Sequence, residues 1–293
     1  VHLVTYTLKY NRMYWLTIDR LGEHWQKAQV DAALIAPNRF AITAGNVRQL
    51  TFSLPAGQRL LAVNSQVELQ IGPDVLKVPA PASDRSWTFT THLADGHWQP
   101  GPLPGEGLAK RSGLQGPIDD ALMDSFIFVA PSGTDSSELV NKWVDGELER
   151  AIVHWRRHFR GHPRVKKDSE ITPEDIAGAN LVLWGTPGMN SLLGKVADRL
   201  PIRWDAKQIT VGGKTYSADS HALIAVYPNP LNPDRYVVLN SSFTFRDYAY
   251  LNNARQVPML PDWAVIDLGT PPGTQYPGKL MAADFFDENW QLK

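Results

Sequence analysis

The chain has 293 residues, of which 43% are hydrophobic and 20% charged, and its formal net charge is −1. This composition is typical of a globular protein with a buried core and leaves room for about two domains. A near-zero net charge gives no general attraction to nucleic acid or to an anionic membrane, so neither is expected as a partner.

Two absences narrow the function classes further. The sequence has no cysteine, which excludes disulfides and thiolate metal sites. It has no apolar run near the ~18 residues of a membrane span, so no spanning segment is expected.

The chain starts without Met, inside a strand-like pattern, and we therefore expect it to be a piece of a longer protein.

Residues 1–98 consist of short runs rich in β-branched and aromatic residues, separated by turns with Gly, Pro and Asn. Their close spacing and partial alternation predict an antiparallel β-sandwich over 1–98. Four tryptophans of this part could stack on sugar rings, which makes a carbohydrate-binding or cell-surface module one alternative function: Trp15, Trp25, Trp87 and Trp98. Tryptophan at strand spacing belongs more often to the core.

Residues 99–118 hold five glycines and four prolines, which favours an irregular connection. From 119 onward the pattern changes to continuous apolar runs with helical spacing between some of them. Such runs suit strands covered on both faces. The sequence therefore predicts a three-layer α/β domain over 119–293 with a mainly parallel sheet. Helices are expected over 137–159, after Thr172, and over 192–200.

The segment 180–200, NLVLWGTPGMNSLLGKVADRL, resembles a phosphate-binding loop at first sight. However, Met189 stands where the first glycine of that motif is required, and Val196 replaces the metal-binding hydroxyl. Gly194 also lies inside the expected helix, where its amide is used by the helix itself. We interpret the segment as a strand–turn–helix joint with Asn190 as the helix cap. A dinucleotide fingerprint is missing as well, so no cofactor is expected.

Serine-hydrolase chemistry is a candidate that the sequence leaves open. The nucleophile motif Gly-x-Ser-x-Gly does not occur in the chain. Ser132, Ser191 and Ser241 nevertheless follow predicted strands, where a nucleophile could stand. His221 with the neighbouring Asp219 could complete a triad. A divergent serine hydrolase in the α/β half is therefore an alternative function.

Two clusters of charged residues have simpler interpretations. His154 and His158 lie four apart on a helix, but the arginines and lysines around them oppose a cation, and no metal site is predicted. The basic segment could instead meet an acidic partner. Asp119, Asp120 and Asp124 lack the spacing of a calcium loop and are interpreted as turn or helix caps.

A ligand site in an open α/β sheet lies outside the carboxyl ends of the strands. Six residues of the expected α/β domain are candidates for ligand binding on this ground: Gly185, Thr186, Asn190, Asn229, Asn240 and Ser241.

Several phrases together resemble a known arrangement: TYTLKYNRMYWLTID (5–19), NVRQLTF (46–52), GLQGPIDDALMDSFIFV (113–129), 180–202 and YPNPLNPDRYVVLNSS (227–242). They resemble the C-terminal accessory region of prolyl-oligopeptidase-like α/β-hydrolase proteins (esterases or peptidases) of environmental bacteria. The resemblance covers most of the chain but includes no catalytic motif, so it assigns no catalytic residue.

This resemblance implies an upstream hydrolase domain that carries the Gly-x-Ser-x-Gly motif, and a secreted or periplasmic location. The leading hypothesis is a non-catalytic accessory region of a secreted serine hydrolase, which packs on or gates the catalytic domain of the same parent chain and helps to hold a polymeric substrate.

Overall fold

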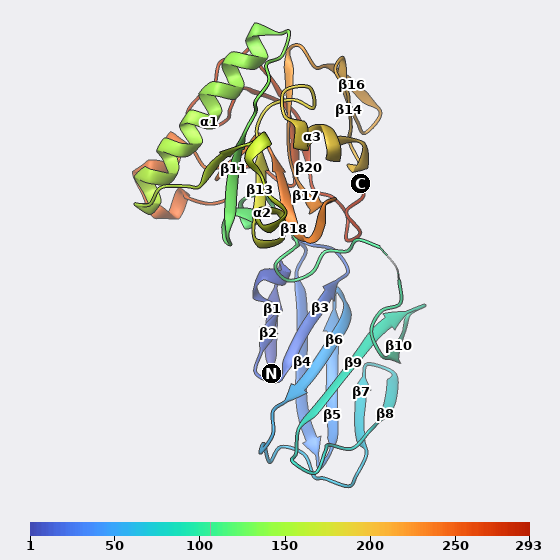
Figure 1. The fold of residues 1–293 in the computed structure, drawn as a ribbon. Coiled ribbons are helices and arrows are strands. Elements are labelled where there is room, and N and C mark those ends of the chain that lie inside the picture. The colour runs from blue at the N-terminus through green and yellow to red at the C-terminus, as the bar shows by residue number, and fades with distance from the viewer. Residues whose placement is uncertain (106) are drawn as a thin grey trace. The chain divides into compact units, whose positions relative to one another are not determined.

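The computed structural model describes residues 1–105 and 107–293; residue 106, in the expected connection 99–118, lies outside the described residues. The described chain is mostly β, with antiparallel and mixed sheets. It divides into two compact units, Val1–Gln115 and Gly116–Lys293 (Figure 1). The boundary between them falls inside the Gly/Pro-rich segment.

The first unit contains two five-stranded sheets. One has the order β1-β4-β5-β7-β8, formed by His2–Thr5, Ala28–Ala36, Arg39–Gly45, Val67–Ile71 and Asp74–Val78. The other has the order β10-β9-β6-β3-β2, formed by His97–Pro100, Trp87–Ala94, Val47–Leu54, Leu16–Leu21 and Arg12–Met13. Neighbouring strands are antiparallel except β5 and β7, which are parallel.

The two sheets share one core, as in a β-sandwich. Phe40 of β5 lies 6.2 Å from Phe52 of β6, between ring centroids, so the inner faces of the two sheets meet. Trp87 stacks on Phe40 at 6.1 Å. Trp87 and Trp98 are buried in this core and present no face to a sugar. The aromatic side chains most exposed in this unit are instead Tyr10 and Tyr14, at 76% and 80%.

The second unit is built on a seven-stranded sheet of order β12-β11-β13-β18-β17-β19-β20. Its strands are Val165–Lys167, Phe126–Ala130, Asn180–Leu183, Asn232–Leu239, His221–Asn229, Trp263–Asp267 and Lys279–Asp284. The pairs from β12 to β18 are parallel, and the pairs from β18 to β20 are antiparallel. The mainly parallel sheet expected from the sequence is therefore not confirmed. Antiparallel β17 is buried along almost its whole length, so a continuous apolar run did not distinguish the two orientations.

Three α-helices belong to this unit: α1 (Glu138–Phe159), α2 (Pro173–Gly178) and α3 (Ser191–Val196). The expected caps at Thr172 and Asn190 are confirmed, because both side chains accept amide hydrogen bonds. The sequence pattern of Asp135 and Glu138 suggests a cap at Asp135 for the first helix, but the cap is Ser137, whose hydroxyl accepts the amide of Val140. Figure 1 shows α1 beside β11, away from α2 and α3. The ring of Trp155 on α1 packs edge-on against Phe126 of β11 at 4.7 Å.

Smaller elements complete the chain. A three-stranded antiparallel sheet is formed by β14 (Arg203–Trp204), β15 (Gln208–Val211) and β16 (Lys214–Ser217). Short 3-10 helices occur at Leu8–Tyr10, Ile118–Leu122, Asp168–Glu170, Ala197–Arg199, Asp247–Leu251 and Asn253–Arg255. Within the described residues, no helix combines the length and the apolar character needed to cross a membrane.

Candidate functional site

The carboxyl ends of the parallel strands form the edge of the sheet where a ligand is expected. β11, β13 and β18 run in the same direction, so the segments that begin at Pro131, Trp184 and Asn240 lie along one edge. Antiparallel β17 begins at His221, on the same edge. The structure thus brings most of the candidate residues to this carboxyl edge.

The crevice between the ends of β11 and β13 is filled by the chain itself. The amide of Gly133 donates to the carbonyl of Met189 at 3.0 Å. A side chain at Gly133 would lie 3.0 Å from the Met189 carbonyl oxygen, and one at Gly185 would lie 3.0 Å from the Met189 Cβ. Gly185 also has φ +107°, which favours glycine. The turn 185–190 therefore occupies the place where nucleotides bind in many open α/β sheets.

Asn190 holds this turn in place. It is fully buried, and its Oδ1 accepts the amides of Leu192 and Leu193 at 3.1 and 3.2 Å. Its Nδ2 donates to the carbonyls of Val129 and Trp184. All these partners are main-chain groups, so a ligand that used Asn190 would have to displace them.

Gly194 explains the apparent Gly-Lys motif. Its amide donates to the carbonyl of Asn190 at 2.9 Å, inside α3. A Cβ at this position would lie 2.9 Å from the carbonyl oxygen of Pro187. Glycine is thus favoured here by the close approach of two backbone segments.

Asn240 joins three strands at the carboxyl edge. Its Oδ1 accepts the amide of Gly185 at 2.8 Å, and its Nδ2 donates to the carbonyls of Gly185 and Leu223 at 2.9 and 3.1 Å. Asn240 is 3% exposed, and its φ of +51° is a conformation that asparagine tolerates. Its side chain is occupied by the main chain of β17 and of the segment after β13.

The remaining ligand candidates are dispersed. The Thr186 hydroxyl donates to Asp135 at 2.9 Å, and the buried Ser241 hydroxyl donates to the Ser242 carbonyl at 3.0 Å. Asn229 ends β17 at the opposite edge of the sheet, where its Oδ1 accepts the amide of Leu231. The structure does not bring Asn229 together with the other candidates.

Two of the candidate serines lie against a carboxylate that the sequence analysis did not single out. Asp168 directly follows β12 and accepts the amide of Ser191 at 2.6 Å. Burial raises the pKa of Asp168, but hydrogen bonds from Ser191 and Ser132 outweigh this effect and lower it. These serines hold the carboxylate of Asp168 in its charged form, so it acts as a hydrogen-bond acceptor for the turn. No histidine belongs to this group of contacts in the described residues.

His221 and Asp219 have other partners. The Nδ1 atom of His221 lies 3.0 Å from the Ser217 carbonyl and 3.1 Å from the Ser220 hydroxyl. The carbonyl of Asp219 accepts the Ser137 hydroxyl at 2.7 Å, at the start of α1. In the part of the chain that the structure describes, no hydrogen bond joins His221 to any of the three candidate serines.

A buried ion pair lies behind the carboxyl edge. Glu147 of α1 and Arg246 are each 6% exposed and are joined by two hydrogen bonds of 2.7 and 3.0 Å. Burial, together with the nearby Arg246, lowers the pKa of Arg150. The guanidinium of Arg150 thus lies near the ion pair but does not share its hydrogen bonds, and it donates to the carbonyl of Phe245 instead. The hollow that the three charged side chains line with Ser241 leaves about 10 Å³ to a water-sized sphere, which is room for one water molecule.

The inner face of α1 continues with two uncharged histidines. The Nδ1 atom of His154 lies 2.9 Å from the Tyr250 hydroxyl and 3.4 Å from the Arg150 guanidinium. An arginine can only donate, so Nδ1 is the acceptor and the imidazole is neutral. Burial, reinforced by Arg150, lowers the pKa of His154 to about 3. Burial and Arg157 also lower the pKa of His158.

The aspartates that the sequence suggested as caps are partners of distant residues. Burial raises the pKa of Asp119 to about 6, although its carboxylate accepts the amide and the hydroxyl of Thr244 at 3.1 and 2.6 Å. Asp120 accepts the Tyr236 hydroxyl at 2.8 Å, and Asp124 pairs with Arg235 at 2.8 Å. Over the described ranges, no group of three His, Asp or Glu side chains is arranged to hold a metal ion.

His154 and Asp119 are expected to give the stability of the protein opposite dependences on pH. The folded pKa of His154 is about 3 against 6.5 in the unfolded chain, so its contribution to stability is lost as the pH falls through this window. The folded pKa of Asp119 is about 6 against 3.8, so its contribution is lost as the pH rises through its own window.

We expect His154→Gln to change the pH dependence of stability. Between about pH 4.5 and 6 the slope of stability against pH should be lower in the variant than in the unsubstituted protein by up to about 1.4 kcal/mol per pH unit, because the contribution of His154 is removed. Urea unfolding at several pH values measures both slopes. Identical slopes would show that His154 is not held neutral in the folded protein.

Residues that sequence reasoning missed come from distant parts of the chain. Glu147 and Arg246 are 99 positions apart, and no local pattern connects them. Asp168 gave no signal either, because a single aspartate after a short strand is common. Comparison of the chain with protein-family models, with curated proteins and with solved structures found no match.

Proposed function

We propose that this chain is a non-catalytic accessory region of a serine hydrolase, an esterase or peptidase, with a secreted or periplasmic location. In this proposal it packs on or gates the catalytic domain of its parent chain and helps to hold a polymeric substrate. The two compact units correspond to two domains, an N-terminal β-sandwich and a three-layer α/β domain. The link to a hydrolase rests on the sequence resemblance.

The proposal that the chain is non-catalytic rests on the environment of His221. A serine nucleophile needs a neighbouring base within hydrogen-bond reach. The Nδ1 atom of His221 is directed to Ser217 and Ser220 instead. Ser191 lies against Asp168 and Ser241 against a backbone carbonyl, which supports structural roles for both.

Hydrolysis of a chromogenic short-chain ester tests this proposal. We expect the chain to match the background rate of an unrelated protein, because none of the candidate serines is hydrogen-bonded to His221. The single variants Ser132→Ala, Ser191→Ala, Ser241→Ala and His221→Ala should all give the same rate. Activity that disappears with one of these substitutions would support a divergent hydrolase instead.

The accessory role has a separate test in the parent chain. In the parent chain, deletion of the region that corresponds to residues 1–293 should raise KM for a polymeric substrate, because binding surface is lost. The kcat for a short ester should stay within about twofold of that of the intact parent chain. Unchanged kinetics on both substrates would contradict the accessory role.

A further inference from the structure

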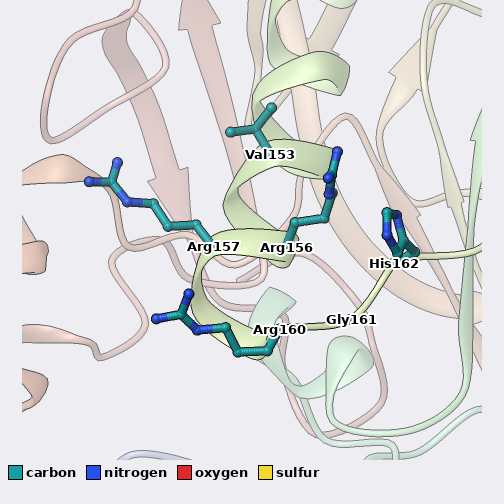
Figure 2. A pocket seen from close by; sticks show the side chains of 6 residues that line it. All are labelled: Val153, Arg156, Arg157, Arg160, Gly161 and His162. Atoms are coloured by element: carbon teal, nitrogen blue, oxygen red, sulfur yellow. The ribbon is translucent and has the colours of Figure 1, made fainter.

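An exposed hollow lined by arginines lies at the C-terminal end of α1. Its volume is about 480 Å³, and its lining, which we call the arginine hollow, comprises Val153, Arg156, Arg157, Arg160, Gly161 and His162 (Figure 2). Figure 2 shows Arg156 on the side of His162, whereas Arg157 and Arg160 extend to the other side. Val153 is 54% exposed and gives the hollow an apolar patch.

The arginine hollow carries three positive charges. Among the described residues, no carboxylate forms an ion pair with Arg156, Arg157 or Arg160. Arg157 lies over the ring of Tyr250 at 4.9 Å, a contact that leaves its charge in place. Elsewhere in the same unit Lys166 pairs with Asp175 at 2.6 Å, and Arg235 pairs with Asp124. The partial negative charge of a helix end, about half a unit, does not balance three cations.

The chemistry of these arginines fits an acidic peptide. Arg156 and Arg157 lie in the last turn of α1, and Arg160 is its C-cap residue with φ +60°. Figure 2 shows that Arg157 and Arg160 extend to the same side, where neighbouring carboxylates of one peptide segment can pair with both. The planar guanidinium suits carboxylates because it donates two parallel hydrogen bonds.

We propose that the arginine hollow binds an acidic peptide segment, whose carboxylates pair with its arginines. An apolar side chain of the same segment packs on Val153, and Arg157 adds a further contact. A long polyanion fits less well, because the three arginines span about one turn of helix and the net charge of the chain is −1. This inference does not depend on the link to a hydrolase.

Fluorescence anisotropy with a labelled peptide of alternating glutamate and valine tests the inference on the full chain. We expect the triple variant Arg156→Gln, Arg157→Gln, Arg160→Gln to bind more than about tenfold more weakly, because charge-assisted hydrogen bonds are lost. The matched control is Lys195→Gln, Arg199→Gln, Lys214→Gln, which removes the same charge at exposed positions outside the arginine hollow and should bind as the unsubstituted chain does.

Three outcomes would overturn the inference. They are no binding of the peptide, an equal loss in both triple variants, and tighter binding of a DNA duplex or of anionic vesicles than of the peptide. Far-UV circular dichroism checks that the variants fold. If the triple variant does not fold, the single variants Arg156→Gln and Arg160→Gln decide the question, and each should weaken binding of the glutamate peptide but not of its glutamine analogue.

Discussion

Replacement of Glu147 by Gln is expected to lower the free energy of unfolding by about 3 to 5 kcal/mol, because it breaks a buried ion pair. The substitution keeps the shape of the side chain but removes the charge that balances Arg246 across hydrogen bonds of 2.7 and 3.0 Å. Arg246 would remain buried, with the guanidinium of Arg150 nearby. Urea unfolding at neutral pH measures the loss.

Glu149→Gln is the matched control for this prediction. Glu149 lies on the same helix but is exposed, so its substitution should change the stability by less than about 0.5 kcal/mol. Replacing both partners, as Glu147→Leu with Arg246→Met, should cost less than Glu147→Gln alone, because no unpaired charge remains buried. A loss below about 1 kcal/mol for Glu147→Gln would contradict the importance of charge pairing at this position.

Asn240→Ala is expected to give the next largest effect, a loss of about 3 kcal/mol. The substitution leaves three buried backbone groups without their partner, namely the amide and carbonyl of Gly185 and the carbonyl of Leu223. Alanine is also strained at a φ of +51°. The same urea titration measures the change.

Asn240→Gly separates the two causes. Glycine loses the same hydrogen bonds but accepts the left-handed backbone, so this variant should be about 1 kcal/mol more stable than Asn240→Ala. A near-neutral Asn240→Ala would indicate that the hydrogen bonds to β17 and to the turn after β13 contribute little, and would leave Asn240 available for a ligand.

Local patterns in the sequence predicted the helices well. The cap at Asn190 and the Thr172-Pro173 start both follow from side chains that satisfy free amides within three residues. The helical spacing of Val140, Trp143 and Trp155 places one face of α1 against the sheet. Such signals depend only on residues that are close in the sequence, so they can be interpreted without knowledge of the fold.

The sheet order could not be predicted in the same way. β17 and β18 are both apolar runs, yet one is antiparallel to β13 and the other parallel to it. The segment 203–217, between β13 and β17, forms a small antiparallel sheet of its own and does not join the large sheet. The three-residue β12 was also too short to give a pattern.

The location of the site could be predicted from the sequence, but the partners of its side chains could not. The carboxyl edge follows from strand direction, and it does collect Ser132, Thr186, Asn240 and Ser241. The partners of these side chains depend on contacts between distant segments, such as Thr186 with Asp135 and Asn240 with Leu223. A polar side chain at this edge can thus serve either a ligand or the main chain, and the sequence alone does not distinguish the two.

Intact-mass spectrometry after incubation with a fluorophosphonate tests most directly whether the polar residues at the carboxyl edge are non-catalytic. The reagent modifies serines that a neighbouring base activates. We predict no change of mass in the folded chain, because the contacts of His221 leave Ser132, Ser191 and Ser241 without a histidine base. One adduct per chain that disappears when one of these serines is changed to alanine would contradict the proposed function.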